Sequence, residues 1–246
     1  MFFILVATIV ATSMLGLSCS KEEMSQRPGD EKYERIGQLH NEGLDFVLDR
    51  LSASQTKGGS GLTREQAMAV VMEAVTAYLE NHGIPTDQVR PEVYCGEEYD
   101  GAGLTDEQKE LYDELIGAIR DPLLDYESTQ KAVSLVEARV AAALPTQEAE
   151  PLLCGIAVAR YSMEYWYNHA DEWELLAGLD NLAYQPMTKA VTPESDEDDL
   201  SWKDLVEADA GGAVVGAIAG GGAGALAGGL TASAADGVGQ LIDKIL

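Results

Sequence analysis

The sequence predicts an all-α fold, a helical bundle of about five helices plus a Gly/Ala-rich C-terminal helix or helical hairpin. Apolar residues recur every three or four positions through the middle of the chain, which is the spacing of one helix face. Thr63 and Thr105 are each followed three residues later by Gln, the pattern of a capping box at a helix start. Sustained strand-type alternation, and Asn-Gly or Asp-Gly turns between apolar runs, are missing.

Five bundle helices follow from these signals. The first begins at Tyr33 and ends at Leu51, before a Gly/Ser-rich break, and the second runs from Thr63 to Gly83. The other three are predicted over residues 105–119, 129–144 and 148–176. The intervening stretch 84–103 has no clean period and is predicted to be a long connection.

Length and charge restrict the classes of function. The 246 residues suit one core of ordinary size with appendages. With 42 acidic against 16 basic residues and a net charge of −26, the chain cannot assemble the basic surface that nucleic acid or anionic lipid headgroups require. We divide the chain into a signal peptide, a lipidated tether, an acidic helical domain, an acidic linker and a glycine-zipper tail, at residues 1–18, 19–30, 31–185, 186–207 and 208–246.

The N-terminus predicts export. Residues 1–18 carry no charge, and an apolar run from Phe2 to Leu17 is followed at once by Ser18-Cys19-Ser20. This pattern indicates a secretory signal, and an uncleaved membrane anchor is the alternative. The small Ser18 directly before Cys19, and the polar chain directly after it, favour cleavage. These residues resemble a lipoprotein signal, which implies that Cys19 is lipidated and becomes the mature N-terminus.

The residues after the cysteine refine this location. Ser20-Lys21-Glu22-Glu23 resembles the short export signal of Bacteroidota lipoproteins that are displayed on the outer face of the cell. The resemblance implies an outer-membrane or cell-surface protein that contacts the membrane through its lipid anchor. A single acyl chain holds a protein only marginally, so stable anchoring depends on the multiple acylation of such cysteines.

The remaining cysteines predict a disulfide. With Cys19 lipidated, Cys95 and Cys154 form an even pair in an oxidising compartment. Two separate thiols, one buried and one in a loop, are the alternative. The chain has no CxxC or Cys/His pattern that would indicate metal or redox chemistry.

Catalytic and metal-binding motifs are sparse. His40 lies on an apolar stripe and is predicted to be a hydrogen-bonded core histidine, while His82 is expected to cap a helix end. His169 and Glu172 share a helix face but lack the second motif of a di-metal bundle, so a polar position at the bundle edge is expected. Glu98 and neighbouring carboxylates have calcium-loop spacing, but glycine stands at the first ligand position. We therefore predict no metal, no cofactor and no enzymatic activity.

One predicted helix is rich in aromatic residues, and two interpretations of it stay open. Tyr161, Tyr165, Trp166 and Trp173 pack into the core with ordinary exposure, or they form a face for an unidentified protein or glycan partner. Tyr161 and Tyr167 lie partly off the face that the other aromatic residues share.

The tail contains a glycine zipper. Residues 211–235 carry no charge, and glycines recur at every fourth position, at Gly212, Gly216, Gly220, Gly224 and Gly228. This register lets another backbone approach closely, and it resembles the Gly/Ala-rich segments of membrane-active bacteriocins. Three outcomes stay open: membrane or self-association, packing against the chain's own bundle, and disorder. A turn at residues 220–222 would make a hairpin of two short helices.

Two functions from different classes follow as expectations. The first is a lipid-anchored extracytoplasmic binding or structural module that acts through its helical domain. The second is a membrane-active protein that self-associates and perturbs bilayers through the tail.

Overall fold

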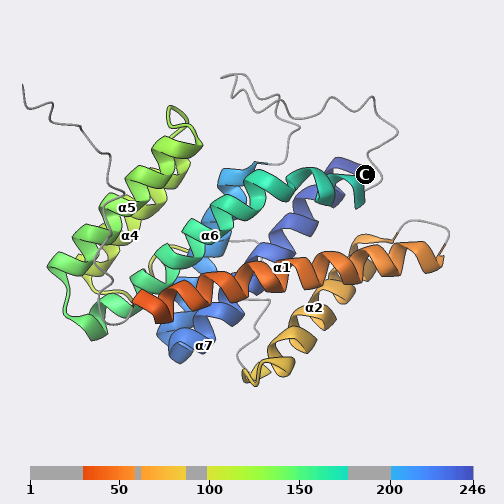
Figure 1. Cartoon of the computed structure of the whole chain (residues 1–246), viewed down its shortest axis with the longest axis horizontal. Coiled ribbons are helices and arrows are strands. Elements are labelled where there is room, and N and C mark those ends of the chain that lie inside the picture. Colours follow the sequence, from red (N-terminus) through yellow and green to blue (C-terminus); the bar gives the residue numbers. More distant parts are fainter. Residues whose placement is uncertain (1–29, 59–61, 87–98, 177–200, 246) are drawn as a thin grey trace, which may run out of the picture.

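The all-α prediction is confirmed. The computed structural model describes residues 30–58, 62–86, 99–176 and 201–245, and these form six helices and no strand. The helices are α1 (Asp30–Gly58), α2 (Arg64–Asn81), α4 (Asp106–Arg120), α5 (Tyr126–Ala143), α6 (Thr146–Leu176) and α7 (Trp202–Ile245) (Figure 1).

Capping residues set where three of these helices begin. Thr63 and Thr105 accept hydrogen bonds from the backbone N–H of the Gln three residues later, and each Gln side chain accepts one in return, so both predicted capping boxes are present. Asp125 caps α5 by accepting from the Ser128 N–H at 2.8 Å, and α5 therefore starts three residues before the predicted 129. A carboxylate at the N-cap satisfies a backbone donor that the helix leaves free.

The first helix is longer than the predicted range 33–51. It continues through polar residues to Gly58, because a helix that is already nucleated gains one backbone hydrogen bond per added residue until a helix breaker intervenes. Ser54 follows this pattern, since its hydroxyl donates to the Arg50 carbonyl one turn earlier.

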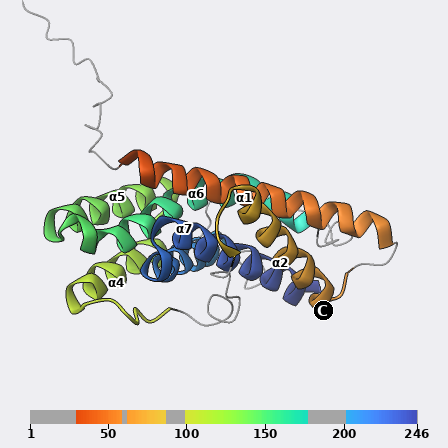
Figure 2. The same ribbon diagram turned by 90° about the horizontal axis from the view of Figure 1, so that it is seen from below.

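The six helices surround one core. α7 packs most extensively against α6 and also contacts α1, α2 and α4, while α4 and α5 pack against each other. In Figure 2, α7 lies beneath α1 and α6, with α4 towards one end of the molecule and α2 towards the other. Buried apolar side chains from every helix form a single cluster.

The glycine-rich tail is a helical hairpin. α7 leaves helical geometry only at Gly220 and Gly221, where φ and ψ are −149° and 20°, and 61° and −147°. The positive φ at Gly221 favours glycine because other residues rarely adopt it. Of the two predicted forms, a helix or a hairpin, the chain adopts the hairpin.

The zipper register brings the two arms of this hairpin together. Gly212 faces Gly228 and Gly216 faces Gly224, with Gly220 at the turn, so the five glycines are arranged symmetrically about the bend. A Cβ added at Gly212 would lie 2.6 Å from the Gly228 carbonyl oxygen. The stripe predicted for self-association is therefore covered within one chain by its own second half.

Of the three outcomes left open for the tail, packing against the chain's own bundle is the one observed. Val214, Leu226 and Leu230 are almost completely buried in the common core. The hairpin and the helices of the predicted domain 31–185 share one hydrophobic core. α7 also begins at Trp202, inside the predicted linker 186–207.

The predicted disulfide is not observed. Cys154 is a free thiol that is completely buried on α6, and burial raises its pKa to about 12, so it stays protonated and unreactive. Its predicted partner Cys95 lies outside the described residues. So do the signal peptide with Cys19, nearly all of the tether, and most of the linker.

Candidate functional site

A buried polar cluster lies where the α7 hairpin meets α1 and α6. The Asp209 Oδ2 atom of α7 accepts hydrogen bonds from the Ser162 hydroxyl and, at 3.1 Å, from the Trp166 indole N–H, both on α6. The His40 Nε2 atom of α1 lies 3.6 Å from the same oxygen, and all four side chains are completely buried. We refer to Asp209, His40, Ser162 and Trp166 as the buried polar cluster.

Helix periodicity brings these side chains together. Ser162 and Trp166 are four residues apart, so they lie on one face of α6, and this face packs on α7. His40 lies within the apolar stripe of α1, and its Nδ1 is 3.1 Å from the Asn41 Oδ1. The prediction that His40 is a hydrogen-bonded core histidine is thus confirmed.

Burial shifts both titratable members towards their neutral forms. It raises the pKa of the Asp209 carboxyl to about 7, although the hydrogen bond from Ser162 opposes the shift. It lowers the pKa of His40 to about 4. Between about pH 4 and pH 7 the favoured state is therefore a protonated Asp209 beside a neutral His40.

The cluster is incompletely hydrogen-bonded. Among the described residues, His40 Nε2 has no partner within hydrogen-bond distance, and the contact between the Asp209 carboxyl and the Ser233 hydroxyl on the second arm of α7 falls short of good hydrogen-bond geometry. A buried polar atom without a partner loses its hydration and gains nothing in return. Burial of these groups therefore has a cost in stability.

The geometry does not support catalysis. Ser, His and Asp are the residue types of a hydrolytic triad. In such a triad the serine hydroxyl donates a hydrogen bond to the histidine, whereas the Ser162 hydroxyl donates one to Asp209. Each of these side chains is also completely buried, so no substrate can reach the serine oxygen. Within the described part of the chain, no group of three or more His, Cys, Asp or Glu residues is placed to hold a metal ion.

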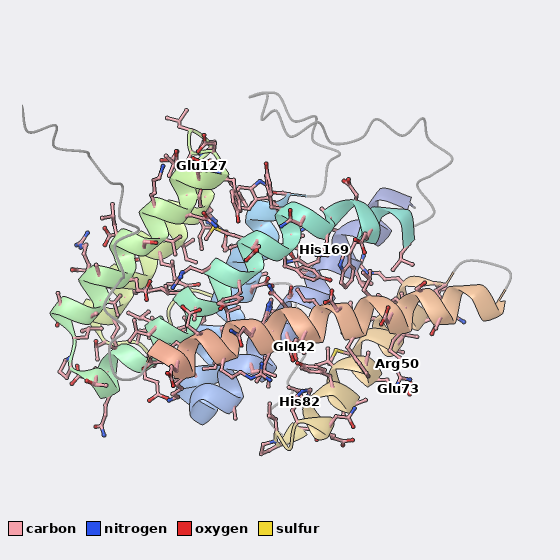
Figure 3. The ribbon with its side chains drawn as sticks, viewed as in Figure 1. Glu42, Arg50, Glu73, His82, Glu127 and His169 are labelled. Atoms are coloured by element: carbon pink, nitrogen blue, oxygen red, sulfur yellow. The ribbon has the colours of Figure 1, made fainter. Side chains whose placement is uncertain are left out.

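The two other histidines lie at the edges of the bundle (Figure 3). His169 stacks on Tyr165 with ring centroids 4.8 Å apart, and its Nδ1 is 3.1 Å from Glu172 Oε1, which is the polar edge position that was predicted. His82 follows the last turn of α2, where its Nδ1 lies 2.8 Å from the Tyr78 carbonyl oxygen. This contact is consistent with the predicted cap.

The predicted partner face is mostly core. Tyr165, Trp166 and Trp173 are almost completely buried, and the Trp173 indole donates to the Tyr165 hydroxyl at 3.1 Å. Glycine on α7 makes room for these rings, since a Cβ at Gly237 would lie 3.0 Å from Trp166. Only Tyr161 is partly exposed, and its hydroxyl donates to Glu34 on α1 at 2.5 Å.

A different group of aromatic side chains reaches the surface. Tyr126 of α5 stacks on Tyr167 of α6, with ring centroids 4.4 Å apart, and the Trp202 ring of α7 lies edge-on to Tyr126 at 6.3 Å. All three rings are half-buried. We refer to Tyr126, Tyr167 and Trp202 as the surface aromatic cluster.

The loop before α5 lies beside this cluster. The Lys203 ammonium, next to Trp202, donates to the backbone carbonyls of Asp121 and Leu124, the latter at 2.8 Å. Leu123 in the same loop is 90% exposed. Sequence patterns missed this cluster because its three rings come from three helices, and the one available signal was that Tyr167 fell off the α6 core stripe.

The hairpin itself is the remaining candidate. The segment Trp202–Gln240 is long and apolar enough to cross a membrane by length and composition, and most of it is buried within the bundle.

Comparison with known proteins finds no match to this chain among family models, curated proteins or solved structures.

Proposed function

We propose that the chain is an exported, lipid-anchored binding module that holds a protein or glycan partner through the surface aromatic cluster. The observation that carries this proposal is that Tyr126, Tyr167 and Trp202 stay partly exposed, next to a loop in which Leu123 is 90% exposed. Rings that combine apolar area with a polar tip are common at binding surfaces. The lipoprotein-like N-terminus favours a role outside the cytoplasm.

Site-specific photo-crosslinking on intact cells tests this proposal. A photoreactive amino acid at Leu123 should give a defined adduct, because the loop that carries it is hydrogen-bonded to Lys203, the residue after Trp202. Leu135 is the matched control, since it is a 68% exposed leucine in the middle of α5. An adduct at both positions, or at neither, would contradict a partner surface at the cluster.

The second candidate is a membrane-active protein. It is favoured by the segment Trp202–Gln240, which meets the length and composition of a membrane-crossing helix. Its basic test is release of an entrapped dye from phosphatidylcholine vesicles, with the unlipidated full chain compared with buffer alone. Deleting residues 208–246 is unsuitable as a control because this segment supplies part of the hydrophobic core.

A further inference from the structure

The α7 hairpin differs from a single straight helix at only two residues. Trp202–Ile245 is helical except at Gly220 and Gly221. If both glycines adopted helical φ and ψ, the two arms would join into one continuous helix. The hairpin conformation depends on glycine here, because Gly221 has φ 61° and ψ −147°.

Only the straight form has an uncharged segment long enough to cross a bilayer. Residues 210–235 carry no charge, and 26 residues in one helix would measure about 39 Å, against roughly 30 Å for the hydrocarbon core. Within the hairpin the uncharged parts of the two arms, 210–219 and 222–235, would measure about 15 and 21 Å. Neither part alone would cross.

The contact between α7 and the bundle contains unmet polar groups. Asp209 on α7 and His40 Nε2 on α1 are completely buried, and Nε2 lies 3.6 Å from Asp209 Oδ2, beyond hydrogen-bond distance. Asp209 and His40, which both lie outside the uncharged segment 210–235, would regain hydration if α7 left its contact with α1 and α6. Packing of α7 against the bundle therefore includes an unfavourable contribution, the burial of polar groups, which α7 would lose in another environment.

We propose that α7 is a two-state element that leaves the bundle and straightens at Gly220 and Gly221, and that a lipid bilayer is the partner of the straight form. In that form the segment 210–235 crosses the hydrocarbon core. This inference rests on the second candidate function and specifies how such activity would arise. An uncharged bilayer is the suitable probe, because a chain of net charge −26 is repelled by anionic headgroups.

Two engineered disulfides test separately whether α7 must straighten and whether it must leave the bundle. Ala213→Cys with Gly229→Cys ties the arms of the hairpin to each other, since a Cβ at Gly229 lies 3.3 Å from the Ala213 Cβ. Gly155→Cys with Val214→Cys ties α7 to α6, where the corresponding distance is 3.8 Å. Both distances are close to those of natural disulfides. Each pair is placed in a full chain whose native cysteines are replaced by alanine.

The experiment is dye release from phosphatidylcholine vesicles, with each protein measured oxidised and then reduced. Far-UV circular dichroism and denaturation establish that each oxidised protein is folded. We expect both oxidised proteins to lose dye release and both to regain it on reduction, so that every protein is its own matched control.

Each of the other possible results would overturn a different part of the proposal. Full activity of the oxidised 213–229 pair would show that straightening is not required. Full activity of the oxidised 155–214 pair would show that α7 does not leave α6. If the cysteine-free parent neither floats with vesicles nor releases dye, the membrane-active function itself fails and the inference falls with it.

Discussion

Asp209 and His40 are ionisable groups that the fold buries in their neutral forms. Their contributions to stability have opposite dependence on pH. The native state keeps a proton on Asp209 that the unfolded state releases above about pH 4, whereas the unfolded state binds a proton on His40 below about pH 6.5. Between these values the two effects oppose each other, so the pair gives little net pH dependence.

Replacing Asp209 removes its contribution to the pH dependence of stability and leaves that of His40. Because the folded pKa of Asp209 is raised to about 7, its contribution to the free energy of unfolding falls as pH rises from about 4 to about 7. Relative to the natural chain, Asp209→Asn should therefore gain stability over that range, by about 4 kcal/mol. Urea denaturation across this pH range measures the difference. Asp204→Asn, at an exposed position of the same helix, is the control and should show a much smaller change.

Replacing His40 should have the opposite sign. The folded pKa of His40 is lowered to about 4, so its stabilising contribution is present above about pH 6.5 and is lost as pH falls. His40→Gln should therefore gain stability relative to the natural chain when the pH is lowered from about 6.5 to about 4. The same denaturation series measures this change, and a difference between the two proteins that does not vary with pH would contradict it.

At the scale of elements, the α7 hairpin depends on close approach of two helices. Their backbones meet where Gly212 faces Gly228 and Gly216 faces Gly224. A side chain at these positions would meet backbone atoms, which cannot rotate away as a flexible side chain can. The glycine register therefore supports a pair of helices within the chain.

Two glycine-to-alanine variants test this requirement. Gly212→Ala should destabilise the protein by about 1–3 kcal/mol, because its Cβ would lie 2.6 Å from the Gly228 carbonyl oxygen. Gly117→Ala in α4 should instead stabilise it by about 0.5–1 kcal/mol, since that Cβ meets nothing within 4 Å and alanine favours the helix. Thermal or urea denaturation measures both. Equal effects of the two substitutions would contradict the close-packed hairpin.

At the scale of the whole molecule, the N-terminal residues predict a membrane anchor, and the fold places the C-terminal tail in the hydrophobic core. The proposed anchor at Cys19 makes membrane residence independent of α7. A protein anchored in this way can keep its apolar hairpin inside a soluble domain, with the acidic helices towards solvent.

Removal of the anchor tests this arrangement. Cys19→Ala should move the protein from the membrane fraction to the soluble fraction of cells, because the acyl chains supply its stable membrane contact. Cys154→Ala is the matched control, since this thiol is buried within α6 and should leave fractionation unchanged. Retention of the Cys19 variant in the membrane fraction would indicate an uncleaved N-terminal helix or insertion of α7.

Local patterns determined the fold class and most helix positions of this protein. Thr63 and Thr105 marked helix starts because a capping box involves residues only three positions apart. The four-residue glycine register likewise determined that a second backbone would approach closely. These features depend on residues only a few positions apart, so they can be predicted from a single sequence.

Only the tertiary structure decided which partner each surface would have. The glycine stripe faces its own second half because the turn at Gly220 and Gly221 folds α7 back on itself. Trp166 is a core residue because Gly237 of α7 leaves room for its ring, while Tyr126, Tyr167 and Trp202 meet at the surface from three helices. Contacts between elements far apart in the chain depend on how the helices pack, and the residue spacing within any one helix does not contain that information.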